Sequence, residues 1–232
     1  MPRRLRAYLP GYTYHIVQRG NNRNICFFDA QDQRVYRRYL AEVSPRYGNC
    51  IHSYCLMSNH IHLLITPTSG TGISNLMKVL GSRYAQYINK RHERTGSLWE
   101  GRHKASAVDS KIYLLNCYRY IELNPVAARM VDSPADYPWS SYRRNALGWA
   151  DDLITPHECY LELGHNSDEL YQNYRYLFNE PLAADVTEAI ERATHHSMPV
   201  GSEEFVATLE AALGRSVGRA SRGRPRKKLI KK

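Results

Sequence analysis

The sequence predicts an α+β fold built around one antiparallel β-sheet. Runs typical of β-strands alternate with runs of helical spacing, in the order β-α-β-β-α-β followed by a further helix. Two of the strands are separated only by the turn residues Ser58-Asn59, so they form a hairpin and run antiparallel. At 232 residues, the chain can bury one substantial core and carry an appendage.

The predicted elements follow one another through the first half of the chain. In the first helix Val35, Tyr39 and Val43 recur at helical spacing, and in the second Leu76 and Leu80 point inward. Strands are predicted over residues 12–19, 25–28, 50–57, 60–66 and 99–108, and helices over residues 31–46 and 73–94. Such an order is typical of a ferredoxin-like (RRM-like) sheet with helices on one face.

The second strand of the hairpin carries the pair His60-Ile61-His62. Successive side chains of a strand point to opposite faces, so His60 and His62 share one face while Ile61 and Leu63 pack into the other. Two imidazoles this close can converge on one divalent cation. Two ligands do not close a metal site, however, and two half-exposed histidines at a sheet edge are the alternative interpretation.

A helix after the last strand carries a candidate nucleophile. Its predicted N-cap is Asp109 or Ser110, and it should end near Asn124, because the residue before Pro125 avoids the α region. Tyr120 and Asn124 are four residues apart and therefore lie on one face of this helix.

Beside the histidine pair, these two side chains suggest phosphoryl chemistry. The histidines and the Asn124 oxygen would hold an ion like Mg²⁺ or Mn²⁺ that polarises a phosphate, and the Tyr120 phenol would attack the phosphorus. Tyr118 lies about 200° away around the helix and cannot share that face.

These motifs carry a family resemblance over roughly residues 8–145. The sequence resembles the single-tyrosine HUH transposases of the IS200/IS605 type, in particular their domesticated relatives, the REP-associated tyrosine transposases. The resemblance rests on the segments Asn59-His60-Ile61-His62-Leu63, Trp99-Glu100-Gly101-Arg102, Arg119-Tyr120-Ile121-Glu122-Leu123-Asn124-Pro125 and Trp139-Ser140-Ser141-Tyr142. It implies that His60 and His62 bind the metal and that Tyr120 is the nucleophile. Asn124 stands where some members have Gln as third ligand.

The resemblance implies a metal-dependent, single-strand-specific DNA endonuclease and strand transferase of the HUH nuclease type. Its Tyr120 would form a 5′-phosphotyrosine on hairpin DNA such as REP elements, with Mg²⁺ or Mn²⁺ as cofactor. Relatives occur as monomers and as homodimers. Two alternatives stay open: a non-catalytic, sequence-specific DNA-binding regulator on the same scaffold, and an RRM-type RNA-binding module. The second is weakened because His occupies the central strand in place of stacking Phe or Tyr.

Charge is strongly segregated along the chain. The net charge is +12 over residues 1–131, −11 over 132–214 and +9 over 215–232. We therefore predict a nuclease domain over residues 1–145, an acidic helical subdomain over 146–214 and a disordered basic tail over 215–232. The basic parts predict DNA contacts from Arg3, Arg4, Arg6, Arg19, Arg102, Lys104, Arg222, Gly223, Arg224 and Pro225.

The acidic part and the tail carry their own local signals. Thr155-Pro156 is typical of an N-cap followed by Pro at the first helical position, and short helices are predicted over residues 167–178, 183–194 and 202–213. Arg222-Gly223-Arg224-Pro225 resembles an AT-hook core, which binds the narrow minor groove of A·T-rich DNA. A non-specific basic tail is the alternative.

Composition indicates the compartment. No apolar stretch approaches the length of a membrane span, and the first residues lack the apolar region of a signal peptide. The five cysteines show no Cys-x-x-Cys pair, so reduced thiols and a cytoplasmic, nucleoid-associated location are expected. Cys55 can lie across the hairpin from His62, which leaves a zinc site as a minor alternative.

Overall fold

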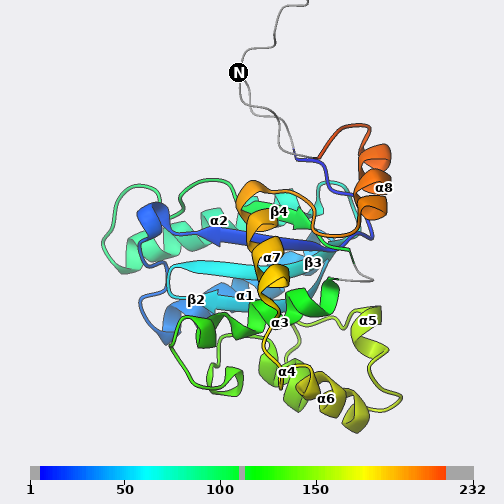
Figure 1. The fold of residues 1–232 in the computed structure, drawn as a ribbon. Helices are drawn as coiled ribbons and strands as arrows, with labels where there is room; N and C mark the ends of the chain where they lie inside the picture. The colour runs from blue at the N-terminus through cyan, green and yellow to red at the C-terminus, as the bar shows by residue number, and fades with distance from the viewer. Residues whose placement is uncertain (1–5, 110–112, 218–232) are drawn as a thin grey trace, which may run out of the picture.

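The computed structural model describes residues 6–109 and 113–217 (Figure 1). Within these ranges one antiparallel sheet has the strand order β2-β3-β1-β4. The strands are β1 (Tyr14–Arg19), β2 (Asn49–Met57), β3 (His60–Pro67) and β4 (Lys104–Ala107). This order, with helices after the first and third strands, confirms the predicted ferredoxin-like sheet.

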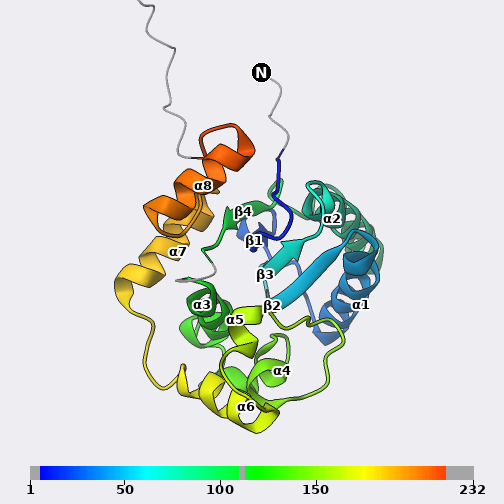
Figure 2. The same cartoon turned by 90° about the vertical axis from the view of Figure 1, so that its right-hand side faces the viewer.

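Helices cover both faces of the sheet (Figure 2). One face packs against α1 (Ala30–Arg46) and α2 (Gly72–Arg91), as the sequence predicts. On the other face lie α3 (Leu114–Ala127) and α7 (Ala184–His196), which crosses in front of the strands in Figure 1. The remaining elements are η1 (Asn21–Arg23), η2 (Pro134–Asp136), α4 (Tyr142–Leu147), α5 (Glu158–Leu161), α6 (Ser167–Tyr176) and α8 (Glu203–Leu213).

Strand alternation divides the apolar residues of the sheet between two cores. Ile61 and Leu63 are fully buried in the core beneath α1 and α2, together with Ile16 of β1. Leu64 points the other way, into a core formed with Cys117 and other residues of α3. The two histidines of β3 therefore lie on the α3 side of the sheet, as the alternation predicts.

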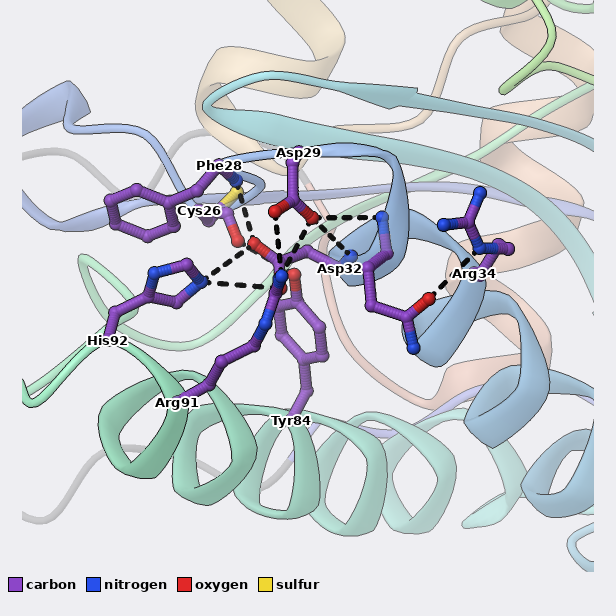
Figure 3. Close-up of polar contacts among 9 residues, drawn as sticks. Cys26, Phe28, Asp29, Asp32, Arg34, Tyr84, Arg91 and His92 are labelled. Atoms are coloured by element: carbon purple, nitrogen blue, oxygen red, sulfur yellow. Dashed lines mark hydrogen bonds and ion pairs between the residues drawn. The ribbon is translucent and has the colours of Figure 1, made fainter.

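A polar network joins the start of α1 to the end of α2 (Figure 3). The Asp32 carboxylate is fully buried and accepts hydrogen bonds from the Phe28 backbone N–H (2.9 Å) and the Arg91 guanidinium. His92 Nε2 lies 3.1 Å from Asp32 Oδ2, and Arg91 also pairs with Asp29 at 2.7 Å. The network holds the segment that precedes α1 in an irregular conformation.

The predicted strand over residues 25–28 is therefore wrong. The backbone N–H groups of Cys26 and Phe27 both donate to the Ser58 carbonyl, at 2.8 and 3.1 Å, so they form no strand ladder. The last strand is also shorter than the predicted 99–108, because Trp99 forms only an isolated bridge to Gly20. Its indole Nε1 donates instead to the Gly81 carbonyl at 3.0 Å.

The tyrosine-bearing helix α3 differs from the prediction at both ends. It continues through Pro125 to Ala127, and the predicted end at Asn124 is wrong. Pro125 has no N–H for the Ile121 carbonyl, and the Asn124 side chain donates there (3.5 Å) and to the Tyr120 carbonyl (2.7 Å).

The predicted N-caps also need correction. The N-cap of α3 is Tyr113 rather than Asp109, whose carboxylate accepts hydrogen bonds from the backbone and hydroxyl of Ser202. The other candidate, Ser110, lies outside the described residues. Further along the chain, α5 is capped by His157 in place of Thr155.

The helices of the acidic part lie close to their predicted positions, and Ser202 caps α8 through its hydroxyl. None of the helices in the described part of the chain is long and apolar enough to cross a membrane.

Candidate active site

A pocket of about 720 Å³ opens on the α3 side of the sheet. It brings together His60 and His62 from β3, Tyr120 and Asn124 from α3, and Thr194 from α7. All four residues predicted for metal binding and nucleophilic attack therefore line one pocket.

The two histidines of β3 have their Nδ1 atoms engaged. His60 Nδ1 lies 2.6 Å from Asn59 Oδ1, and His62 Nδ1 lies 2.8 Å from Nε2 of His15. The ring centroids of His60 and His62 are 4.8 Å apart. His62 Nε2 is buried and has no hydrogen-bond partner among the described residues. The histidine pair thus offers Nε2 atoms as ligands.

Burial keeps both imidazoles neutral. It lowers the pKa of His60 to about 4 and that of His62 well below its usual value, and neighbouring positive charges act in the same direction. Neutral imidazole is the form that binds a metal ion.

Tyr120 lies beside these rings. Its ring centroid is 5.9 Å from that of His62 and 5.8 Å from that of His15, both in edge-on geometry. Burial raises the Tyr120 pKa to about 12, and the negative charge of Glu191 on α7 adds to this effect. The phenol therefore carries its proton at neutral pH.

Asn124 lies one turn after Tyr120 on the same face of α3. Because its Nδ2 donates to the Tyr120 carbonyl, its Oδ1 is the atom available to a ligand. Tyr118 is fully buried on the opposite side of the helix, where its ring stacks against Tyr160 with centroids 6.0 Å apart. The predicted helix phase is therefore correct.

Glu122 fixes that phase from the far side of α3. Its buried carboxylate accepts hydrogen bonds from Ser141 (2.5 Å), Asn145 (2.9 Å), Tyr174 (2.7 Å) and Ser53 (3.3 Å). Burial raises its pKa to about 7 despite these four donors. The interactions attach α3 to β2, to the start of α4 and to α6.

The rim of the pocket is mainly basic, although Glu100 and Glu191 also line the pocket. Four of the predicted DNA-contacting residues line it, and Arg23 joins them: Arg6, Arg19, Arg23, Arg102 and Lys104. Arg23 is the last residue of η1 and has a left-handed backbone, with φ of 61°. The other predicted contacts, Arg3, Arg4, Arg222, Gly223, Arg224 and Pro225, lie outside the described residues.

Two parts of the site were not predicted. His15 of β1 contacts both His62 and Tyr120, and α7 contributes Glu191, Thr194 and His195 to the pocket. The sequence held a signal for His15, because β1 and β3 are neighbours in a ferredoxin-like sheet. It held none for α7, which is separated from the histidine pair by more than a hundred residues.

The structure does not favour the zinc alternative. In residues 6–109 and 113–217, no group of three His, Cys, Asp or Glu side chains is arranged to hold a metal ion. Cys55 is the cross-strand neighbour of His62, but it is fully buried and its thiol donates to the Met57 sulfur at 3.5 Å.

Comparisons with known proteins identify the class of this protein as a transposase. Residues 9–124 match the family described as "Transposase IS200 like". This range is half of the 232 residues, and the chain belongs to the IS200-like transposase family.

One solved structure shows the same fold. A REP-associated tyrosine transposase bound to a REP hairpin is similar over 68% of this chain and 93% of that one, with 20% sequence identity and a TM-score of 0.54. A putative transposase from Deinococcus radiodurans matches 52% of this chain and 95% of that one, with 19% identity and a TM-score of 0.37. Among curated proteins no match to this chain is found.

Proposed function

We propose that this transposase is a metal-dependent, single-strand-specific DNA endonuclease and strand transferase with Tyr120 as its nucleophile. The observation that carries the proposal is the meeting of His60, His62, Tyr120 and Asn124 in one pocket with a basic rim. The folded, single-stranded substrate is a hairpin such as a REP element, and the REP hairpin bound by the structural relative supports this choice.

The residues present fit a divalent cation. The buried Nε2 of His62 has no partner among the described residues, which is expected of a ligand atom and costly otherwise. His60 and His62 would hold the ion through Nε2, and Asn124 would contribute Oδ1. The amide oxygen of Asn124 is a donor of the kind that suits Mg²⁺ or Mn²⁺, and imidazole nitrogen is a ligand of transition-metal ions. When bound, the ion supplies polarisation of the scissile phosphate.

The remaining chemistry belongs to the protein. The Tyr120 oxygen loses its proton and forms a bond to phosphorus, while the bond from phosphorus to the 3′-oxygen breaks. The released 3′-oxygen takes up a proton, so the products are a 3′-hydroxyl and a 5′-phosphotyrosine. Attack by a 3′-hydroxyl on the phosphotyrosine reverses the step and joins strands.

The basic rim would bind the DNA backbone on either side of the scissile phosphate. Arg19 and Arg23 come from the end of β1 and the turn after it. Arg102 comes from the segment just before β4, and Lys104 is the first residue of β4. Phosphate contacts of this kind supply most of the sequence-independent affinity of a DNA-binding protein.

We further propose the organisation predicted from charge: a nuclease domain over residues 1–145, an acidic helical region over 146–214 and a basic tail over 215–232. A chromosomal substrate implies a nucleoid-associated, cytoplasmic protein. A single chain supplies every proposed site residue, which is compatible with a monomer and with a homodimer.

The test is to trap the covalent intermediate. A hairpin substrate labelled at its 3′ end, incubated with protein and Mn²⁺, should give a labelled protein band on a denaturing gel. Tyr120→Phe should bind the hairpin but give neither the band nor cleavage, whereas Tyr118→Phe should give both. A Tyr120→Phe protein that still forms the adduct would assign the nucleophile to another residue. Hairpin binding without any adduct in the wild type would favour the non-catalytic regulator.

A further inference from the structure

His15 connects the histidine pair to a helix far along the chain. It lies in β1 with 1% of its surface exposed, and its ring is nearly parallel to that of His62, with centroids 5.1 Å apart and an interplanar angle of 16°. His15 Nε2 lies 2.8 Å from His62 Nδ1, and His15 Nδ1 lies 3.1 Å from the Thr194 hydroxyl oxygen of α7. Both ring nitrogens of His15 therefore have partners, and a chain of hydrogen bonds runs from β3 through β1 to α7.

The chain of hydrogen bonds decides which nitrogen of His62 carries the proton. A neutral imidazole has one N–H donor and one acceptor nitrogen. If the Thr194 hydroxyl accepts from His15 Nδ1–H, then His15 Nε2 accepts from His62 Nδ1–H, and His62 Nε2 is free of a proton. If the hydroxyl donates instead, every bond reverses and His62 Nε2 is protonated. Only the first arrangement leaves His62 able to bind a metal ion.

We propose that His15 is a positioning residue for His62 and that Thr194 completes the arrangement, so that α7 is part of the metal site without supplying a ligand. This inference rests on the proposed function, in which His60 and His62 hold a divalent cation. Hydrogen bonds from ligand histidines to such partners fix the ring orientation and the tautomer, and their loss typically weakens metal binding roughly 10- to 100-fold.

His15 does not act as a third ligand in this arrangement. Its Nε2 and Nδ1 are both engaged, so binding an ion would require the ring to break its hydrogen bond to His62 or to Thr194. The helix that supplies Thr194 spans residues 184–196, beyond the range 9–124 that matches the transposase family. The contact is therefore a property of this chain rather than of the matched family segment.

Metal affinity and histidine tautomers test the proposal on the full chain. Thr194→Val removes the hydroxyl and keeps the shape, Thr194→Ser restores the hydroxyl, and His15→Phe removes both nitrogens. Thr187→Val is the matched control, because the Thr187 hydroxyl, also on α7, donates to the Ala183 carbonyl at 3.2 Å at the start of its own helix. The Mn²⁺ dissociation constant, measured from the EPR signal of free Mn²⁺, should rise roughly 10- to 100-fold in Thr194→Val and His15→Phe. It should stay near the wild-type value in Thr194→Ser and Thr187→Val.

Nitrogen-15 NMR of the metal-free protein supplies a readout independent of metal binding. His62 should be protonated at Nδ1 in the wild type and in Thr187→Val, and should shift towards the Nε2–H form in Thr194→Val. Wild-type Mn²⁺ affinity in Thr194→Val, together with an unchanged His62 tautomer, would overturn the role of Thr194 and α7. If His60→Ala also leaves the Mn²⁺ affinity unchanged, the proposed metal site at His60 and His62 is itself contradicted. If His60→Ala abolishes binding while Thr194→Val and His15→Phe do not, only the positioning role fails.

Discussion

Stability should fall steeply below neutral pH, and His52 supplies a measurable share of that fall. This side chain is buried in β2, where its Nδ1 lies 2.7 Å from the Thr155 carbonyl oxygen and its Nε2 lies 2.8 Å from the Thr66 hydroxyl. The carbonyl can only accept, so Nδ1 carries the proton of the neutral ring and Nε2 accepts from Thr66. A second proton on Nε2 would force the Thr66 hydroxyl to accept instead of donate, and it would bury a charge.

The magnitude follows from the pKa. Burial lowers the pKa of His52 to about 4 in the folded protein, against its ordinary value of 6.5. The unfolded chain therefore binds more protons between these two values, and the free energy of unfolding decreases as the pH falls from 6.5 towards 4. The difference between the two pKa values lowers the free energy of unfolding by roughly 3 kcal/mol at pH 4, since one pKa unit is worth about 1.4 kcal/mol.

The assay compares the wild type with His52→Asn, in which the Asn amide can still donate to the Thr155 carbonyl but does not titrate. Urea unfolding at several pH values between 4 and 8 should show the wild type losing roughly 2–3 kcal/mol more than the variant across this range. Other buried histidines titrate equally in both proteins and cancel in the difference. If the free energy of unfolding depended on pH in the same way in both proteins, His52 would be protonated without loss of stability. The argument from its burial would then be wrong.

Three further predictions concern the site and the tail. His60→Ala and His62→Ala should each reduce cleavage by at least 100-fold, and EDTA should do the same until Mn²⁺ or Mg²⁺ is added back; cleavage that persists in EDTA contradicts the metal role. Asn124→Ala should reduce cleavage less than either histidine variant, because water can replace a neutral oxygen ligand. The measurement is the cleavage activity as a function of Mn²⁺ concentration. A loss as large as that of the histidine variants would contradict this weaker role of Asn124. Residues 218–232 carry eight Lys and Arg residues. Deleting them should reduce the slope of the logarithm of DNA affinity against the logarithm of salt concentration by roughly 0.7–0.9 for each phosphate that the tail neutralises. An unchanged slope would mean that the tail binds no phosphate.

The sequence was sufficient wherever structure depends on local periodicity. Alternation in β3 correctly separates His62 from Ile61 and Leu63, because a strand has only two faces and one of them must enter the core. Helical spacing likewise separates Tyr120 from Tyr118, and the structure has the first at the pocket and the second in the core.

Local propensity failed at two places, the predicted strand over residues 25–28 and the predicted end of α3. Ile25 and Phe28 suggest a strand, yet both are exposed, at 46% and 39%, and hydrogen bonds to Asp32 and to the Ser58 carbonyl hold their segment in an irregular path. Pro125 suggests a helix end, but the Asn124 side chain donates to the carbonyl that Pro125 leaves without an N–H partner. The first compensation depends on residues distant in the sequence, whereas the second is a local hydrogen bond from Asn124 to the preceding turn of its own helix.

The direction of the Tyr120 side chain depends on interactions on the far side of its helix. Glu122 is two residues from Tyr120 and therefore about 200° away around α3. Its carboxylate accepts from Ser53 on β2, Ser141 at the start of α4 and Tyr174 on α6, three elements that approach from different parts of the chain. Rotation of α3 would break all of these hydrogen bonds at once and leave a buried carboxyl group unsatisfied. The spacing of residues in the sequence thus sets which side chains share a face, whereas this buried cluster sets where that face points. Three of the four side chains that donate to Glu122, namely Ser141, Asn145 and Tyr174, follow residue 124, where the family match ends.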